Sequence, residues 1–365
     1  MHLADHLTNK GAGIKEEPMK PLRVAVIGAG WVTLHRHIPS LLAQPGVQIV
    51  GIVDRLADRA RETSQSLKIK YWSNSASLSD IPWFAEADAV TIGTAPFSHH
   101  ALACEALSLG KHVLTEKPFA MTPDEGREMI AAARKAERIL AIIHNFQFSR
   151  ACQHLVRDMQ NGLLGDIEAI EAMQLSNPRR RLPTWYDRLP GGLFFDESPH
   201  LLYLIRHLGG GTPDLLAAFA EKGRGASSTP ALLSAHFASP RGITVRLALN
   251  FVTPVSEWHI LVCGEKALGC IDIFRDIYVR LPNDGLHVTS TVFRTSLLTT
   301  WQHWLGHLIP GFQHLRGGGM YGNLEVMRRF VAACRSNVVP EGISSQDGLE
   351  VLCLQHEILT RCQLL

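Results

Sequence analysis

A short β-branched run that ends on a glycine is the feature that most constrains the fold of this chain. Residues 23–27 read RVAVI, Gly28 follows at once, and Gly30 comes two positions later. A run of this kind is typical of a strand buried on both faces of a parallel sheet. From about Trp31 to Ala43 the apolar spacing becomes helical, so the sequence predicts a strand, a tight turn and a helix.

The alternation of strands and helices continues as far as Asn145. Further strands are predicted at 47–53, 87–95, 111–118 and 139–145, and helices at 55–67, 99–110 and 122–138. This order indicates a doubly wound parallel sheet, and hence an N-terminal α/β Rossmann domain over residues 22–144. Residues 1–21 are predicted to be a flexible polar tail, because they lack the apolar centre of a signal peptide.

Beyond residue 145 the pattern changes to longer β-rich stretches with few helices between them. These stretches are 167–175, 231–238, 243–252, 257–264 and 269–274. They predict an open, mainly antiparallel sheet in a C-terminal α/β domain over residues 145–342. A helix is expected at about 198–208, and an amphipathic helix at 348–362 dominates the last segment, 343–365.

The segment 296–318 is rich in apolar and aromatic residues, among them Trp301, Trp304 and Phe312. Its composition favours a buried helix pair, and the alternative is a cover for a subunit interface or for the mouth of a site. His303 and His307 are four residues apart and could share one helix face. No third ligand is evident near them, so no metal site is predicted.

The composition is that of a globular chain, with 46% hydrophobic and 19% charged residues and a formal net charge of +2. This charge gives no reason to expect a nucleic acid or a membrane as a partner. Seven cysteines are scattered without a CxxC pair, which fits reduced thiols and a cytoplasmic location. The one local basic cluster, Arg179–Arg181, indicates either a solvated loop or a contact for an anionic substrate group.

The first glycine turn predicts a dinucleotide site. Gly28 and Gly30 allow a tight turn and let main-chain N–H groups approach a pyrophosphate at the start of a helix. Asp54 ends the second predicted strand, where a carboxylate accepts hydrogen bonds from the adenosine ribose and repels a 2′-phosphate. We therefore expect NAD, with NADP as the alternative because Arg55 could hold a 2′-phosphate. The first residues of the following helix complete the predicted site: Trp31 and Val32.

The TEKP stretch at 115–118 is a second candidate for chemistry. It lies at the end of a predicted strand, in the crevice region where open α/β sheets bind ligands. Lys117, beside Glu116, is well placed to lie near a nicotinamide ring. Taken alone, such a lysine is more often an ordinary surface residue.

Several motifs in order along the chain resemble the Gfo/Idh/MocA family of NAD(P)-dependent oxidoreductases. They are the Gly28–Gly30 turn with HIPSL after it, TAPFSHHALACEALSLGKHVLTEKPFA, HNFQFSRACQHLVRDMQNGLLGDIEAI, GGLFFDESPHLLYLI and SSQDGLEVLCLQHEIL. The resemblance covers nearly the whole chain from about residue 22. It implies a Rossmann domain, a second domain whose open sheet serves oligomer contacts and walls the active site, and a last helix that packs back on the first domain.

The resemblance also implies site residues. Lys117 matches the family's EKP lysine, which contacts the cofactor and the substrate hydroxyl. Asp196 and His200 match the acid and the histidine of the family's GG-x-L-x-D-x-G-x-H motif, with the histidine as acid/base. A His suits removal of a hydroxyl proton while hydride leaves, and a nearby Lys⁺ stabilises the developing alkoxide. Further matches line the cofactor: Thr94, Pro96, His99 and Asn145.

The chain departs from the family pattern around the expected substrate. Ser198 replaces the family's glycine and Pro199 follows, both of which suit the start of a helix. Tyr203 stands where relatives often carry Asp, and Gln147 replaces the Arg of the N-Y-R-F segment. On the substrate side, Trp185 and the adjacent Tyr186 either stack on a sugar ring or simply pack. The predicted substrate contacts are Lys117, Trp185, Asp196, His200 and Tyr203.

Together these features predict hydride transfer between NAD(P) and a secondary alcohol or ketone carbon of a sugar, nucleotide-sugar or cyclitol. The sugar comes from the resemblance alone, as does a homo-oligomer, dimer or tetramer, formed through the open sheet. Two alternatives remain: an NAD-dependent glycosidase that oxidises transiently and eliminates, and a cofactor-binding regulatory protein without turnover. Retention of Lys117 and His200 counts against the second.

Overall fold

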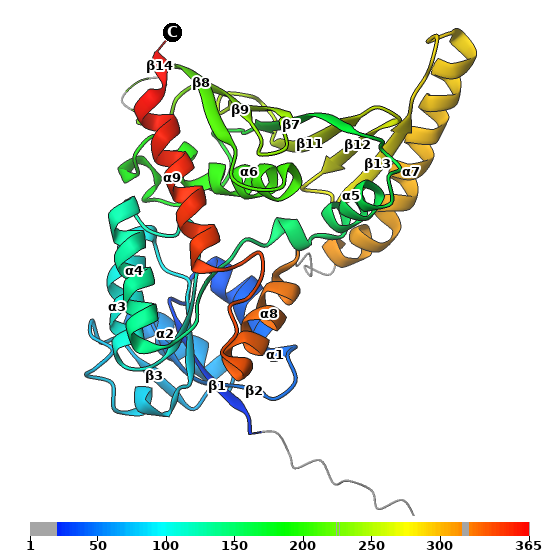
Figure 1. Ribbon diagram of the computed structural model, residues 1–365. Coiled ribbons are helices and arrows are strands. Elements are labelled where there is room, and N and C mark those ends of the chain that lie inside the picture. The colour runs from blue at the N-terminus through cyan, green and yellow to red at the C-terminus, as the bar shows by residue number, and fades with distance from the viewer. Residues whose placement is uncertain (1–19, 224, 226, 316–320, 365) are drawn as a thin grey trace, which may run out of the picture.

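Two β-sheets and the helices around them make up the molecule, and both are seen in Figure 1, one below the other. The computed structural model describes residues 20–223, 225, 227–315 and 321–364. The predicted tail, 1–21, therefore lies almost wholly outside the described residues. Among those described, no helix is both long enough and apolar enough to cross a bilayer.

The first sheet is parallel throughout, with the strand order β3-β2-β1-β4-β5-β6. This confirms the predicted doubly wound Rossmann sheet. The order reverses between β1 and β4, which opens a crevice at the carboxyl ends of the strands. The three-residue edge strand β3 was not predicted, because YWS carries no apolar run. The strands are β1 (Leu22–Ile27), β2 (Val47–Val53), β3 (Tyr71–Ser73), β4 (Ala89–Ile92), β5 (His112–Thr115) and β6 (Leu140–Ile142).

Helices cover both faces of this sheet. One face packs on α1 (Ile38–Leu42), α2 (Ala57–Ser66) and α8 (Asn323–Ser336), which shares the core of residues around Phe330. The other face packs on α3 (His99–Ser108) and α4 (Pro123–Ala136). Thr122 caps α4 as its sequence predicts, because its side chain accepts a hydrogen bond from Glu125 N and Pro123 occupies the first turn.

The second sheet is mixed but mainly antiparallel, as predicted, with the order β13-β12-β11-β7-β10-β9-β8-β14. Helices α5 (Arg150–Gln160) and α6 (Leu193–Gly209) cover one of its faces and share its core. Strands β8, β13 and β14 were not predicted. The strands are β7 (Ile167–Leu175), β8 (Asp214–Glu221), β9 (Leu232–Ala238), β10 (Thr244–Asn250), β11 (Glu257–Gly264), β12 (Ala267–Asp272), β13 (Ile277–Pro282) and β14 (Gln363–Leu364).

Helix α6 begins at Leu193, five residues earlier than predicted, so the expectation that Ser198 and Pro199 start it was wrong. Gly191 and Gly192 form the turn before it, with φ values of 67° and 56°. A Cβ on Gly192 would lie 2.1 Å from Thr229 Oγ1, so only glycine fits there. That hydroxyl accepts the hydrogen bond from Leu193 N at 2.9 Å and caps the helix from a distant loop.

Pro199 lies inside α6 and cannot donate a hydrogen bond to the carbonyl one turn back, at Phe195. Gln355 compensates for this loss. Its Nε2 donates to Phe195 O at 2.8 Å and to Ser198 Oγ at 3.0 Å. Gln355 belongs to α9 (Ser345–Arg361), so the Ser198–Pro199 pair is matched to a side chain from the end of the chain.

Helix α9 packs on α4 and β6 beside the first sheet and on α6 and β8 beside the second (Figure 1). Ser344 and Asp347 form a capping box at its start. Arg206 of α6 holds it with ion pairs to Asp347 at 2.7 Å and Glu350 at 2.6 Å. The last helix therefore joins the two halves of the molecule.

The prediction of a buried helix pair at 296–318 was wrong. Thr289–Leu315 forms one continuous helix, α7, which lies along the edge strand β13. Trp301 and Trp304 are 61% and 67% exposed. The prediction was wrong because an apolar composition does not show whether the rest of the chain covers a helix. The end of the predicted segment, 316–318, lies outside the described residues.

Candidate active site

Two predicted catalytic residues meet where the two sheets face each other. Lys117 follows β5 at the carboxyl edge of the first sheet, and Asp196 lies in the first turn of α6. Lys117 Nζ donates to Asp196 Oδ1 and to the Asp196 main-chain oxygen, each at 2.9 Å. Their side chains are only 17% and 10% exposed. The fold thus pairs a cation and a carboxylate that are 79 positions apart.

The environment of Lys117 keeps it charged. Burial lowers the pKa of its ammonium, but Asp196, Glu116 and Glu197 together raise that pKa above its ordinary value. Glu116 braces the same segment, since its Oε2 accepts a hydrogen bond from Lys117 N at 3.0 Å and its Oε1 lies 2.9 Å from His37 Nε2. His37 was missed by sequence reasoning, because nothing near it in the chain indicates a carboxylate partner.

His200 lies one turn after Asp196 and is partly exposed. Burial lowers the pKa of its imidazole well below the ordinary value, and Lys117 and then His144 act in the same direction. The ring is therefore neutral at neutral pH. Its Nδ1 lies 3.0 Å from the hydroxyl of Tyr203, which also accepts a hydrogen bond from Phe146 N at 2.9 Å.

Tyr203 and Asn145 lie behind His200. Tyr203 is 2% exposed, stacks on His144 with ring centroids 4.4 Å apart, and donates to Asn145 Oδ1 at 3.4 Å. Asn145 Nδ2 donates to Tyr321 O at 3.0 Å. The structure therefore gives these two predicted ligand contacts a place in the hydrogen-bond network that orients His200.

The glycine turn has the shape that a dinucleotide requires. Gly28 has φ 87°, and a Cβ on it would lie 2.7 Å from Gly93 O, so the fold itself demands glycine there. A Cβ on Gly30 would meet nothing closer than Gly93 O at 3.8 Å. Its lack of a side chain leaves room in the crevice, which suits close approach of a pyrophosphate to the main chain. Trp31 and Val32 follow and are 44% and 39% exposed.

The side chain of Asp54 lies against the glycine turn and is 7% exposed. Its Oδ2 accepts a hydrogen bond from Ala29 N at 2.8 Å and its Oδ1 from Leu56 N at 2.9 Å. Each carboxylate oxygen keeps a lone pair for a ribose hydroxyl. Arg59 contacts this carboxylate, with Nη1 3.6 Å from Oδ2, and Arg55, which could hold a 2′-phosphate, is exposed.

The loop after β4 is held by His99. Its ring nitrogens lie 2.8 Å from Pro118 O and 3.2 Å from Thr94 O, and the side chain is fully buried. His99 therefore joins the Thr94 loop to the Lys117 loop, and both its nitrogens already have partners. Thr94 Oγ1 lies 2.7 Å from Ser98 Oγ, and Pro96 is buried at the start of the next turn.

The loop 177–188 reaches from the second sheet to the glycine turn. The Arg181 guanidinium lies 4.8 Å from the Trp31 ring centroid, and Arg188 lies 4.6 Å from that of Phe97. Trp185 meets Phe97 edge-on at 6.4 Å. Arg181 of the basic cluster thus contacts Trp31, which directly follows the glycine turn, although Arg179 and Arg181 are both exposed.

Glu197 is the buried residue that sequence reasoning missed most clearly. It lies beside Asp196 and contacts Arg180 and Gln174, with Ser176 Oγ at 3.3 Å. Burial raises its pKa, while Arg180 opposes the rise. The sequence signal for Glu197 was its place next to Asp196 in FFDESPH. The family motif gives a role to Asp196 and none to Glu197.

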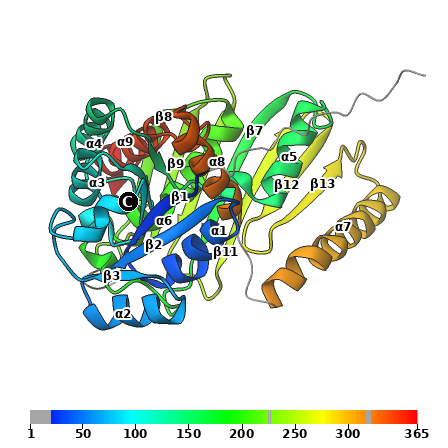
Figure 2. The ribbon, with the colours of Figure 1, turned by 90° about the horizontal axis from the view of Figure 1, so that it is seen from below.

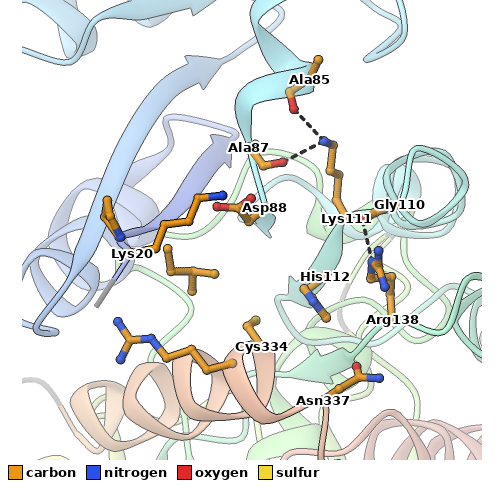
Figure 3. A pocket seen from close by; sticks show the side chains of 13 residues that line it. Lys20, Ala85, Ala87, Asp88, Gly110, Lys111, His112, Arg138, Cys334 and Asn337 are labelled. Atoms are coloured by element: carbon orange, nitrogen blue, oxygen red, sulfur yellow. Dashed lines mark hydrogen bonds between the residues drawn. The ribbon is translucent and has the colours of Figure 1, made fainter. Parts of the chain in front are cut away.

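A cavity of about 530 Å³ lies elsewhere, at the amino ends of β1, β4 and β5 (Figure 3). Basic side chains dominate its lining, and Lys111 Nζ donates to Ala85 O at 3.1 Å and Ala87 O at 2.7 Å. It is at the opposite ends of the strands from Lys117. The predicted catalytic residues do not line it.

Possible metal ligands are already engaged. In the described part of the chain, Glu257, His259 and Asp272 are the group of three whose ligand atoms converge. Arg275 supplies a cation there, 2.6 Å from Glu257 and 2.5 Å from Asp272.

Comparison with known proteins agrees with this geometry. Residues 22–144 match the family model described as "Oxidoreductase family, NAD-binding Rossmann fold", and residues 152–268 match the Gfo/Idh/MocA C-terminal domain. D-glucoside 3-dehydrogenase of Escherichia coli is 33% identical over 191 residues, which are 50% of this chain and 52% of that protein. A Streptomyces antibioticus enzyme, dTDP-3,4-didehydro-2,6-dideoxy-alpha-D-glucose 3-reductase, is 29% identical over 64% of this chain and 70% of its own.

Among solved structures, the WlbA dehydrogenase of Bordetella pertussis in complex with NADH and UDP-GlcNAcA matches with a TM-score of 0.76 and 18% identity, over 95% of this chain and 96% of that one. At this identity the likeness shows the fold. The chain spans about half the length of several curated relatives that it matches. Since both family models match in order along most of its length, the chain belongs to the Gfo/Idh/MocA family of oxidoreductases, with an NAD-binding Rossmann fold.

Proposed function

We propose that the chain transfers hydride between NAD(P) and a secondary alcohol or ketone carbon of a sugar, nucleotide-sugar or cyclitol. The observation that carries this proposal is the charged Lys117, fixed by Asp196 at 2.9 Å, next to a neutral, partly exposed His200. The family membership and the two relatives named for acting at carbon 3 of a hexose support it.

The glycine turn and Asp54 fit the cofactor. The main-chain N–H groups at Gly30 and at the start of the following helix would hold the pyrophosphate, because those of Gly28 and Ala29 already donate to Val53 O and Asp54. Asp54 would hold the adenosine ribose, and the Thr94 loop would line the nicotinamide side. Bound NAD(P) supplies the hydride acceptor or donor. Arg59 beside Asp54 is the residue that we expect to decide how well a 2′-phosphate is tolerated.

Lys117 and His200 divide the work at the substrate oxygen. The two bonds to Asp196 use two of the three N–H donors of Lys117, which leaves one for a substrate hydroxyl. That donor stabilises negative charge as the oxygen loses its proton. His200 takes the proton through Nε2, because Nδ1 faces Tyr203.

Tyr203 controls which nitrogen of His200 carries a proton. When Tyr203 donates to Asn145, His200 Nδ1 must donate to the tyrosine oxygen, and Nε2 is a base. In the reverse direction the imidazolium, whose Nδ1–H still donates to the tyrosine oxygen, returns its Nε2 proton to the ketone oxygen. The Tyr203 hydroxyl therefore keeps Nε2 available to the substrate in both directions, so Tyr203 is a positioning residue.

Aromatic side chains support a sugar as substrate. The partly exposed ring of Phe146 lies 4.7 Å from that of His200, and the partly exposed Trp185 lies in the loop that faces Phe97. The C–H face of a sugar packs well on such rings. Arg180 is paired with Glu197, so an anionic nucleotide part would meet Arg181 and Arg188.

The test is a screen of glucosides, nucleotide-sugars and cyclitols followed by NADH absorbance, after mass spectrometry of any co-purified nucleotide. Reduction of NAD⁺ or NADP⁺ in proportion to substrate consumed is the expected result. Release of a sugar from a glycoside with no net change in cofactor would contradict the proposal and favour the glycosidase alternative.

A homo-oligomer through the second sheet and a cytoplasmic location remain part of this proposal. The face of that sheet away from α6 carries exposed residues on β10, namely Thr244, Arg246 and Ala248. Analytical ultracentrifugation of the wild type and of Ala248→Arg tests the oligomer. We expect the variant to dissociate; a monomeric wild type would contradict this part.

A further inference from the structure

Helix α7 turns polar residues toward the protein. It is held to the edge strand β13 by Gln302, whose Nε2 donates to Arg280 O at 2.9 Å and whose Oε1 accepts from Arg280 N at 3.0 Å. Gly306 lies so close to Ile277 that a Cβ there would be 2.8 Å from Cγ2. Apart from Leu298, the partly buried residues of this inner face are polar or small: Thr291, Thr295, Thr299, Gln302, His303 and Gly306.

The outer face of α7 is apolar. Its residues recur every three or four positions and so form one stripe along the helix. In Figures 1 and 2 the helix lies at the far edge of the second sheet, beyond β13. We call this set the α7 stripe, and its members are between 42% and 67% exposed: Phe293, Leu297, Trp301, Trp304, Leu305 and Leu308.

An exposed stripe of this kind needs a cover. Two indoles, a phenyl ring and three leucine side chains expose on the order of several hundred Å² of apolar surface, which monomeric proteins rarely leave to water. The polarity of α7 is reversed relative to a helix that packs on its own core. Burial within this chain therefore does not explain the sequence of the stripe.

The charge around α7 indicates what covers it. The sequence has no Asp or Glu between Asp284 and Glu325, while Arg294 and Arg316 lie in that interval. A protein partner constrains charge only on the face it touches. The field of an anionic bilayer acts within about a Debye length on every face of a helix and on the segments beside it. Such a field repels carboxylates on every face of the helix, which agrees with their absence from this part of the sequence.

We propose that α7 docks on an anionic lipid surface, lying in its plane with the α7 stripe in the headgroup region. Tryptophan, phenylalanine and leucine on one face of a helix are the residues that enter this region, where an indole buries its rings and keeps its N–H in polar surroundings. The +2 net charge had given no reason to expect a membrane partner. This docking goes beyond the proposed hydride transfer and does not depend on it.

Flotation of the full chain with vesicles tests the docking. We expect it to float with vesicles of equal parts phosphatidylglycerol and phosphatidylcholine, and to bind pure phosphatidylcholine more weakly. The double variant Trp301→Ser, Trp304→Ser should bind about tenfold more weakly or worse, because two indoles no longer leave water. Arg294→Glu should weaken binding to the anionic vesicles only.

Trp72→Ser is the matched control, since Trp72 is 40% exposed on the distant strand β3 and its loss should leave flotation unchanged. Unchanged circular dichroism would show that the double variant folds. No flotation of the wild type, or equal flotation of the double variant, would overturn the proposal. A wild-type dimer that does not bind vesicles and that dissociates in the double variant would also overturn it. The α7 stripe would then be covered by a second copy of the chain. Lys117→Met should float normally, which separates docking from catalysis.

Discussion

The ion pair between Lys117 and Asp196 gives the most direct prediction at the residue scale. Lys117→Met removes the ammonium that donates to Asp196 Oδ1 and that we propose donates to the substrate hydroxyl. We expect kcat/KM to fall by roughly a factor of 10³, the usual effect of losing a charge-stabilising donor. NADH binding, followed by nucleotide fluorescence quenching, should change little, because Gly28 and Asp54 hold the other end.

Asp196→Asn is the matched partner of this variant. It keeps an oxygen near Lys117 Nζ but removes the negative charge, so we expect a smaller loss of turnover than in Lys117→Met. Wild-type rates in both variants would remove Lys117 from the reaction.

A pH profile tests the state of His200. Because burial, Lys117 and His144 lower its pKa well below the ordinary value, its proton is gone throughout the neutral range. Oxidation of the alcohol should therefore keep its rate as the pH falls from about 8 to about 6.5, the ordinary pKa of histidine, and decline only below that value. A rate that halves near pH 6.5 would contradict the assignment.

Tyr203→Phe tests the role of His200 by removing its hydrogen-bond partner. The variant keeps the ring that stacks on His144 but removes the hydroxyl that lies 3.0 Å from His200 Nδ1. We expect kcat to fall about tenfold with little change in KM, and the acid limb of the pH profile to move. A purely structural role would alter stability and leave the position of that limb unchanged.

Cofactor choice rests on Asp54 and Arg59. Asp54→Ala should weaken NAD more than NADP, since the carboxylate serves the ribose hydroxyls and repels a 2′-phosphate. Arg59→Ala should weaken NADP and leave NAD nearly unchanged, because its guanidinium lies 3.6 Å from Asp54. Dissociation constants from titration calorimetry decide this. Equal losses for both cofactors in both variants would disprove the assignment.

At the element scale, the coupling of α6 to α9 can be isolated. Gln355→Leu leaves Phe195 O without its partner, because Pro199 has no N–H to offer. An unsatisfied buried carbonyl costs about 1–3 kcal/mol of unfolding free energy. Pro199→Ala restores a main-chain donor, so Gln355→Leu should cost clearly less in that background. Urea denaturation of the four proteins gives the coupling energy.

Gln346→Leu on the same helix is the control, because Gln346 is exposed and its Nε2 donates to Glu350 Oε1 at 3.1 Å on the surface. Its cost should be a few tenths of a kcal/mol. Equal costs for Gln355→Leu with and without Pro199 would show that the proline has no part in the coupling.

The elements that the sequence predicted are those whose signals are local. The parallel strands, the glycine turn and the cap of α4 each depend on residues within a few positions of one another. The start of α6 depends on Thr229, which is 36 positions from Leu193, and its proline is balanced by Gln355, 160 positions from Phe195. The spacing of apolar residues contains no information on such distant contacts, so the predicted start of α6 was too late in the sequence.

The candidate site divides in the same way. Lys117, Asp196 and His200 were predicted because motifs carry them, and the structure brings them together, although their catalytic roles remain predictions. His37 and Glu197 were missed because their partners come from distant segments. Helix α7 was predicted to be buried because composition cannot show which face of a helix is turned to water.

At the scale of the whole molecule, histidines kept neutral by burial link stability to pH. Burial lowers the pKa of His144 to about 3, and burial with Arg138 lowers that of His112 to about 4. His112 Nδ1 also accepts a hydrogen bond from Ile139 N at 3.0 Å, which a protonated ring cannot do. His112 belongs to the first sheet and His144 lies where both halves meet, so acid should weaken the fold as a whole.

The sign follows from proton binding. Below about pH 6.5 the unfolded chain protonates His144 while the folded chain does not, so the free energy of unfolding falls with pH until about pH 3. One such group contributes about 2 kcal/mol of loss between pH 7 and pH 5. His144→Phe keeps a ring against Tyr203, which it contacts at 4.4 Å, and removes the titrating group. Urea midpoints from pH 5 to 7 should therefore vary less in this variant than in the wild type, whereas exposed His236→Gln should follow the wild type. If His144→Phe keeps the full wild-type dependence, His144 is not neutral in the fold, and the network that orients Tyr203 must be redrawn with a charged ring.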